Sequence, residues 1–242
     1  MELIIASEPI TNTTPIDKVA EIYTPPGWTN LFTRMKDDLY EIARNIENKE
    51  KEFGLISYPK RIDIFRAFHL TPLNKVRVVI IGQDPYHSTG NGGQPVADGL
   101  SFSTHGIQPS LSNIFTEIKN NYPDFQPPKC GRLDYWAYQG VFMYNTTLTV
   151  TPGKPNEHQG MWDGFTEDVI KEITNTRPNV IFCLWGNEAK KMKKLLGNKC
   201  IVLESSHPSP LGANKGFFGC GHFKKINDYL LSFGETPIDW QL

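Results

Sequence analysis

Short continuous apolar runs alternate along the chain with longer segments in which apolar residues recur every three or four positions. The runs lie at residues 76–81, 140–144, 180–185 and 200–203, and each is followed by a glycine or a polar residue. Runs without polar alternation are typical of strands buried on both faces, and strands that alternate with helices are typical of parallel sheets. The pattern predicts an α/β fold in which a central, mostly parallel four-stranded sheet carries helices on both faces.

Helical periodicity fills the segments around these runs. It is clearest at residues 30–54, where the apolar positions fall on one helix face: Leu31, Met35, Leu39, Ile42 and Ile46. Similar patterns predict helices at residues 110–121, 162–176 and 188–196.

The N-terminal residues 1–29 are rich in threonine and proline, which predicts an irregular lead-in to a single domain at residues 30–242. A chain of 242 residues with 39% hydrophobic and 21% charged residues can form one sizeable core. Its apolar runs are far shorter than the ~18 residues of a membrane span, and its start lacks the basic segment and long apolar core of a secretory signal. We therefore expect no membrane association and an intracellular location, in the nucleus or the cytoplasm depending on the source.

The cysteine spacing and the distribution of charge indicate which kinds of ligand the chain can bind. The four cysteines lack the paired spacing of a zinc site: Cys130, Cys183, Cys200 and Cys220. Two of them lie in apolar runs, which is typical of buried thiols in a reducing compartment. The net charge is −1, but residues 187–225 contain eight lysines and only two acidic residues. Such a cluster is either a solvated helix face or a surface that attracts a polyanion.

Polar side chains follow three of the predicted strands. Asp84, Tyr86 and His87 come after the first run, Asn145 after the second and His207 after the fourth. Because ligands of parallel sheets bind beyond the carboxyl ends of the strands, we expect these side chains to share one cleft. Taken singly, each also has a structural explanation, as a turn residue, a cap, a packing aromatic or part of a rigid proline turn.

Six segments resemble motifs of the family 1 uracil-DNA glycosylases. They are GQDPYH at 82–87, GLSFS at 99–103, YNTTLTV at 144–150, HPSPLG at 207–212, GFFGCGHF at 216–223 and TPIDW at 236–240. The resemblance implies an enzyme of base excision repair that flips uracil out of DNA and hydrolyses its N-glycosidic bond. It implies neither a metal nor a cofactor.

The resemblance also assigns the catalytic residues. Asp84 matches the carboxylate that orients the attacking water and stabilises the cationic sugar, a role for which a low or ordinary pKa is expected. His207 matches the histidine that donates a hydrogen bond to uracil O2 as negative charge develops on the base. The backbone amide of Gln83 serves the same oxygen.

Three further matches define the uracil pocket. Asn145 matches the amide that pairs with uracil N3–H and O4, a pattern that cytosine reverses. Tyr86 matches the ring that blocks the C5 methyl of thymine, and Phe102 matches the aromatic that stacks on the base.

The remaining matches are contacts to DNA. Leu211 matches the apolar wedge that fills the vacated position in the base stack. The other candidate DNA-binding residues are Ser110, Ser206, Ser209, Lys215, His87, His158 and Asn187.

The chain departs from the family pattern at several positions. The loop at residues 88–98 is longer than expected, and Asp98 replaces a histidine before Gly-Leu. Asn187 and Gly212 each replace a serine. None of these changes involves Asp84, Asn145 or His207.

The expected partner is uracil-containing DNA, single- or double-stranded, bound by a monomer, with a protein inhibitor or replication proteins as further candidate partners. Two other functions stay open at this stage. One is a DNA-binding or replication-accessory protein in which catalysis is secondary. The other is a metal-dependent hydrolase built on the aspartate and histidine residues, which the spacing supports poorly.

Overall fold

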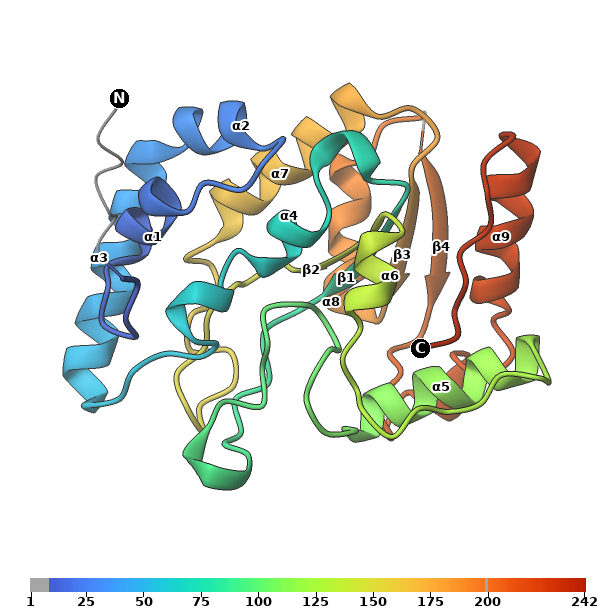
Figure 1. The fold of residues 1–242 in the computed structure, drawn as a ribbon, viewed down its shortest axis with the longest axis horizontal. Coiled ribbons are helices and arrows are strands. Elements are labelled where there is room, and N and C mark those ends of the chain that lie inside the picture. Colours follow the sequence, from blue (N-terminus) through green and yellow to red (C-terminus); the bar gives the residue numbers. More distant parts are fainter. Residues whose placement is uncertain (1–8, 199) are drawn as a thin grey trace, which may run out of the picture.

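A four-stranded parallel sheet forms the centre of the molecule (Figure 1). The computed structural model describes residues 9–198 and 200–242. The strands are β1 (Val78–Gly82), β2 (Val141–Asn145), β3 (Ile181–Trp185) and β4 (Ile201–Ser205), in the order β2-β1-β3-β4. All three pairings are parallel. The predicted fold is confirmed, and every predicted strand is found within two residues of its expected bounds.

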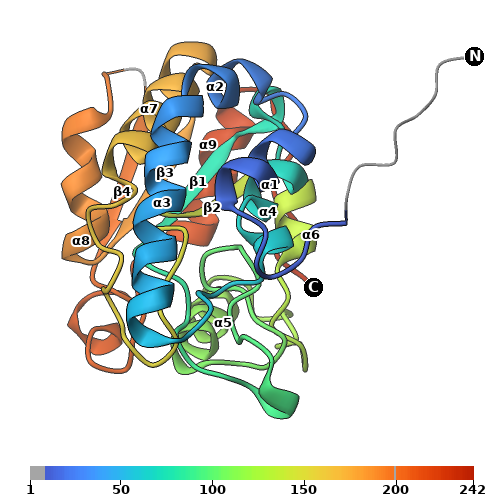
Figure 2. The same ribbon diagram turned by 90° about the vertical axis from the view of Figure 1, so that its left-hand side faces the viewer.

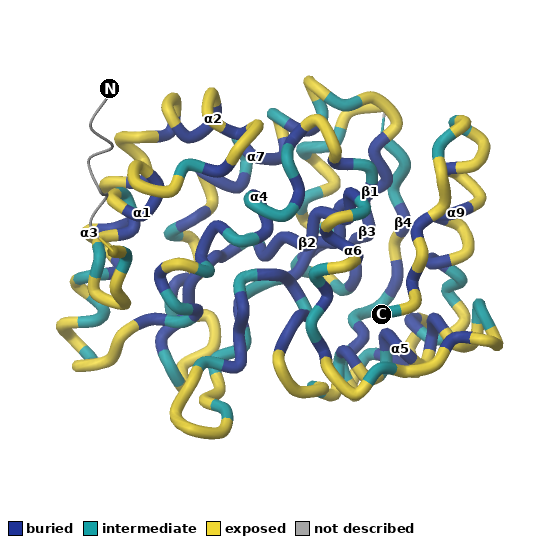
Figure 3. Tube along the Cα trace, in the orientation of Figure 1, coloured by how far each residue is buried: buried dark blue, intermediate teal, exposed yellow. Residues whose placement is uncertain are grey.

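Helices cover both faces of the sheet (Figures 1 and 2). One face packs against α1 (Ile16–Ile22), α2 (Thr29–Arg34), α3 (Lys36–Phe53), α4 (Arg66–Leu70), α7 (Asp163–Thr176) and α8 (Asn187–Lys190). The other packs against α5 (Pro109–Asn121), α6 (Asp134–Tyr138) and α9 (His222–Ser232). Successive residues of one strand enter opposite cores, as Val79 and Ile80 of β1 do. Every residue of β1, β2 and β3 is therefore buried, whereas β4, at the edge of the sheet, is only partly buried (Figure 3).

Short 3₁₀ turns complete the secondary structure of the described residues. They lie at Arg61–Asp63, Leu73–Lys75, Asn91–Gly93, Lys191–Leu195 and Ala213–Lys215. No helix among the described residues is both long and apolar enough to cross a membrane.

Three predictions of secondary structure need correction. The helix expected at residues 30–54 is two helices, because the backbone at Met35 leaves the helical conformation between α2 and α3. The helix expected at 188–196 is α8 followed by a 3₁₀ turn. The lead-in at 1–29 is more ordered than its composition predicts, because it contains α1 and the start of α2. Helix α1 forms because Ile16, Val19 and Ala20 make an apolar stripe that is buried in the core. Residues 1–8 of the lead-in, and Lys199 of the lysine-rich segment, lie outside the described residues.

The carboxyl ends of β1 and β2 meet at Gly82 and Asn145, which are partners in the strand register. A Cβ atom on Gly82 would lie 2.1 Å from Asn145 Oδ1 and 2.8 Å from Ser101 Cβ. The glycine that ends the first predicted strand therefore makes room for the amide that follows the second.

Candidate active site

A cavity of about 200 Å³ opens at the carboxyl ends of β1 and β2. It gathers residues from four of the six motif segments, GQDPYH, GLSFS, YNTTLTV and HPSPLG, together with Ser110: Gln83, Asp84, Tyr86, His87, Phe102, Ser110, Asn145 and His207. Pro85, Ala97, Gly99 and Leu100 complete the lining together with Gly82. The predicted convergence of the loops after three different strands is confirmed.

Asp84 is held by the loop between β2 and α7. The backbone N–H of Asn156 donates to Asp84 Oδ2 at 3.1 Å, and the side-chain amide of Gln83 donates to Asn156 Oδ1. Burial raises the pKa of Asp84 above its ordinary value, while the Asn156 hydrogen bond and nearby His87 oppose the rise. The expectation of a low or ordinary pKa is therefore wrong, because desolvation outweighs the hydrogen bond. A raised pKa makes the ionised carboxylate a better acceptor for a proton of water.

Asn156 is a site residue that the sequence did not reveal. Its backbone is in the left-handed region, with φ 65°, a conformation that asparagine adopts more readily than most residues. No motif or spacing marks the contact, since it depends on the path of the loop between β2 and α7.

His207 is fixed in one tautomer. The backbone N–H of Ser209 donates to His207 Nδ1 at 3.0 Å. A neutral imidazole that accepts at Nδ1 carries its proton on Nε2, where it can serve as a donor. Burial also lowers the pKa of His207. The residue is therefore a neutral hydrogen-bond donor on the wall of the cavity.

Close packing of glycines sets the position of His207. A Cβ atom on Gly186 (φ 89°) would lie 2.9 Å from His207 Cβ, and one on Gly212 would lie 2.4 Å from the His207 carbonyl oxygen. Gly212, one of the departures from the family pattern, thus allows the chain after the HPSPL turn to fold back against His207.

Aromatic rings form another wall of the cavity. Phe102 has φ 63°, and its ring centroid lies 5.6 Å from that of Trp185 and 5.8 Å from that of His207. The hydroxyl of Tyr86 is buried, without a hydrogen-bond partner in the described part of the chain, and burial raises its pKa. The Tyr86 side chain therefore acts at this site through its shape.

Asp98, another departure, is a buried anchor. Its carboxylate accepts hydrogen bonds from Ser103 Oγ at 2.7 Å and Leu100 N at 3.3 Å, and it lies 3.4 Å from Arg66 Nη1. Arg66 also binds Asp134 of α6. This ion-pair network fastens the segment that carries Phe102 to α4 and α6.

The HPSPL turn carries the candidate wedge on a braced loop. Ser206 Oγ donates to the Gly212 carbonyl at 2.8 Å, and Asn113 Nδ2 donates to the Pro208 carbonyl at 2.8 Å. Leu211 is 84% exposed at the end of this loop. Ser209 and Lys215 lie on the same loop, and Asn187 is exposed at the start of α8. These residues lie outside the cavity, on exposed or half-buried positions.

The assignment of His158 as a DNA contact is wrong. Its side chain is 0% exposed and lies between two threonine hydroxyls, 2.9 Å from Thr149 Oγ1 and 3.0 Å from Thr151 Oγ1. Burial lowers the pKa of His158 to about 4. The residue is a structural histidine of the loop that follows β2.

A second cavity, of about 540 Å³, also reaches Gln83 and Asp84. Its other lining residues come from the loop before α7, from α7 itself and from the lysine-rich segment after β3. Asp84 thus lines both cavities. No group of three or more His, Cys, Asp or Glu side chains within residues 9–198 and 200–242 is arranged to hold a metal ion.

Known proteins resemble this chain over most of its length. The family model of the uracil DNA glycosylase superfamily matches residues 68–231. The uracil-DNA glycosylase of Proteus mirabilis is 44% identical over 226 residues, which cover 90% of this chain and 97% of that protein. The enzyme of Francisella philomiragia is 44% identical over 223 residues, with 89% and 100% covered.

Solved structures agree. The crystal structure of mimivirus uracil-DNA glycosylase superposes with a TM-score of 0.82 at 30% identity, over 89% of this chain and 86% of that one. A mimivirus UNG variant in complex with UGI gives a TM-score of 0.84 at 29% identity, with 93% and 91% covered. The cavity joins the GQDPYH, GLSFS and HPSPLG segments. The family match and these relatives agree with that arrangement, and this chain therefore belongs to the uracil-DNA glycosylase superfamily.

Proposed function

We propose that the cavity at the carboxyl ends of β1 and β2 is the uracil pocket. Asp84 and His207 act in this pocket on opposite sides of the scissile bond. The chain is a uracil-DNA glycosylase of base excision repair, which hydrolyses the N-glycosidic bond of deoxyuridine and leaves an abasic site. The observation that carries the residue assignment is the tautomer of His207, which presents a neutral Nε2–H to the same small cavity that Asp84 lines.

Charge separation defines the task of the two residues. As the bond between C1′ and N1 breaks, its electron pair leaves with uracil, and the sugar becomes cationic. Asp84 stabilises that cation and accepts a proton from the water molecule as its oxygen bonds to C1′. Asp84 then loses the proton to solvent, and the released uracil anion takes a proton from solvent. His207 donates its Nε2–H to O2 of the departing uracil anion, together with the backbone N–H of Gln83. Donors placed in advance toward a developing oxyanion are worth about 3–4 kcal/mol of barrier each.

The pocket distinguishes uracil from the other pyrimidines. The Asn145 amide accepts from N3–H and donates to O4, and Phe102 stacks on the base. Cytosine reverses both polar groups, and each unpaired buried group costs about 1–3 kcal/mol. Thymine has the same polar edge as uracil, so only the ring of Tyr86 opposes its methyl group.

Uracil must leave the base stack to reach this pocket, which costs a few kcal/mol. Leu211 fills the vacated space, since it is the exposed apolar side chain of a braced loop. The residues that contact the phosphates and sugars are Ser110, Ser206, Ser209, Lys215, His87 and Asn187. Both single- and double-stranded DNA are substrates, and the lysine-rich segment supplies attraction at longer range.

The chain acts as a monomer inside the cell, in the nucleus or cytoplasm depending on its source. An inhibitor protein is a further candidate partner, because a solved relative is in complex with UGI. Replication proteins are candidates of the same kind. Light scattering of the purified chain, and its localisation with a fluorescent tag, test these assignments separately.

Uracil release is the direct test of the proposed function. The substrates are single- and double-stranded oligonucleotides that differ only in uracil, cytosine or thymine at one position, incubated with excess EDTA. Free uracil should appear from both uracil substrates, with no base released from the other oligonucleotides. Binding of uracil-containing DNA without release would instead favour an accessory DNA-binding function, and activity that EDTA abolishes would favour a metal-dependent hydrolase.

A further inference from the structure

The loop that makes this chain longer after GQDPYH is an ordered hairpin. Val96 N donates to the Ser88 carbonyl at 3.1 Å, and Gly90 N donates to the Gln94 carbonyl at 2.7 Å. The tip, Asn91–Gly93, is an exposed 3₁₀ turn. In Figure 1 this hairpin, in green, extends from the edge of the molecule at which the carboxyl ends of the strands lie. It therefore projects beside the uracil cavity.

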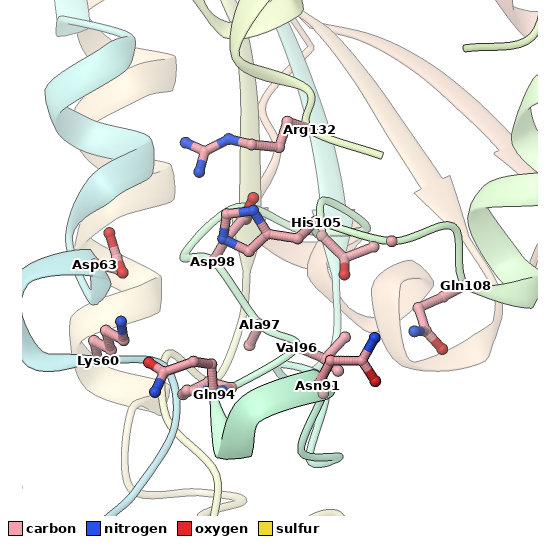
Figure 4. Close-up of a pocket in the computed structure, with 14 residues that line it drawn as sticks. Lys60, Asp63, Asn91, Gln94, Val96, Ala97, Asp98, His105, Gln108 and Arg132 are labelled. Atoms are coloured by element: carbon pink, nitrogen blue, oxygen red, sulfur yellow. The ribbon is translucent and has the colours of Figure 1, made fainter. Parts of the chain in front are cut away.

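A groove of about 570 Å³ lies between the hairpin and the segment that follows Phe102. Figure 4 shows Asn91 and Gln94 on the hairpin side of the groove, with His105 and Gln108 across from them. Ala97 lines both the groove and the uracil cavity, so the two are neighbours. A volume of this size is within the range of sites that hold small ligands.

Three side-chain amides that line this groove are free to bind a ligand. The side chains of Asn91, Gln94 and Gln108 make no hydrogen bond within the described part of the chain. Paired donors and acceptors on one planar amide are suited to the edge of a nucleobase. The half-buried Asp63 carboxylate also lines the groove and can accept from an exocyclic amino group.

The basic and acidic side chains of the groove also divide into those that make an ion pair and those that do not. Arg132 is paired with Asp134, and Asp98 with Arg66. Lys60 and His105 make no ion pair with any described residue, and both line the groove. They are placed to meet a phosphate while the amides meet a base.

We propose that this groove holds a nucleotide that flanks uracil in single-stranded DNA, with its base against the amides and its phosphate near Lys60 and His105. The inference rests on the proposed function and adds a second subsite to it. A single strand is the partner because its bases are free to turn outward, whereas a neighbouring base in a duplex stays paired and stacked.

A double-mutant cycle tests the subsite. Gln94 and Gln108 are replaced together by alanine, with Asn120→Ala as the control, since Asn120 is an exposed amide on α5 outside the groove. Single-stranded substrates carry normal nucleotides, or apolar base isosteres that keep sugar and phosphate, at two positions either 5′ or 3′ of uracil. Thermal unfolding verifies that each variant is folded.

For the wild type, isosteres on one side should lower kcat/KM about tenfold through KM, the size of one lost bidentate contact. Gln94→Ala/Gln108→Ala should lose the same factor on the normal substrate and nothing further with isosteres. Asn120→Ala should behave as wild type, and a double-stranded substrate should show no coupling.

Equal losses on normal and isosteric substrates, or no loss on either side of uracil, would overturn the proposal and leave the groove a solvated surface. Either result leaves uracil release by the wild type intact. Failure of the proposed function would instead appear as absence of uracil release from every substrate.

Discussion

The backbone N–H of Ser209 donates a hydrogen bond to Nδ1 of His207 across 3.0 Å. This contact, made within one proline turn, commits the neutral imidazole to a proton on Nε2. Protonation of Nδ1 would break the contact and place a charge in a largely buried site, and burial lowers the pKa of His207 accordingly. The histidine can therefore act as a donor without first becoming a cation.

The pH dependence of uracil release follows from Asp84. Because burial raises its pKa, the carboxyl group is protonated at pH values where an ordinary aspartate is still ionised. The single-turnover rate should therefore be constant near neutral pH and fall as the pH drops through a midpoint above 3.8, the ordinary value. A rate that rises on acidification, or a midpoint at or below 3.8, would contradict this role for the ionised carboxylate.

Gly82→Ala should damage uracil recognition while the fold persists. The new Cβ would lie 2.1 Å from Asn145 Oδ1, so the amide must leave its place in the pocket. We expect kcat/KM for uracil release to fall at least about tenfold, the cost of one misplaced hydrogen-bonding group. The control is Gly164→Ala in α7, where a Cβ atom meets nothing within 4 Å. Unchanged kinetics for Gly82→Ala would contradict the assignment of Asn145 to uracil recognition.

Tyr86→Ala should allow slow release of thymine. The ring is the only group that we assign to exclusion of the C5 methyl, and steric rejection of one such group is worth about 10- to 200-fold. Tyr86→Phe is the matched control: it keeps the ring and removes a buried hydroxyl that has no partner in residues 9–198 and 200–242. Thymine release measured from a T-containing oligonucleotide should appear with alanine and not with phenylalanine. If the two variants behaved alike, a group other than the Tyr86 ring would have to exclude thymine.

Leu211→Ala should affect double-stranded substrates more than single-stranded ones. The side chain is 84% exposed, so its loss should change the free energy of unfolding by less than about 0.5 kcal/mol. A wedge is needed where a base must be replaced in a stack, so kcat/KM should fall mainly for duplex DNA. Leu231→Ala, at a 58% exposed leucine of α9, provides the control. A uniform loss on both substrates would identify Leu211 as a general contact and not a wedge.

Much of the fold was predictable because three of the four strands are fully buried. Their continuous apolar runs, such as that of β3, are distinct from the helical periodicity around them. Helix α1 escaped prediction because its seven residues follow a threonine- and proline-rich stretch and depend on packing against α3. The break at Met35 likewise interrupts an apolar stripe that reads as continuous in the sequence.

The side chains that line the cavity were predictable, but several of their environments were not. Short motifs place Asp84, Asn145 and His207 at strand ends, and the parallel sheet brings those ends together. The contact of Asn156 with Asp84 and the burial of His158 depend on the path of the loop between β2 and α7, and the raised pKa of Asp84 depends on how deeply the folded chain buries the carboxylate. These features result from tertiary packing, and no local pattern in the sequence predicts them.

The most direct test of the account is the single-turnover rate of uracil release by Asp84→Asn. The amide keeps the size of the side chain but removes the charge that stabilises the cationic sugar. The measurement uses a single-stranded oligonucleotide with one uracil and enough enzyme to saturate the DNA. We predict that Asp84→Asn binds this DNA as the wild type does and releases uracil at least about a hundredfold more slowly. A variant that binds normally and keeps most of the wild-type rate would contradict the assignment of Asp84 to the chemical step.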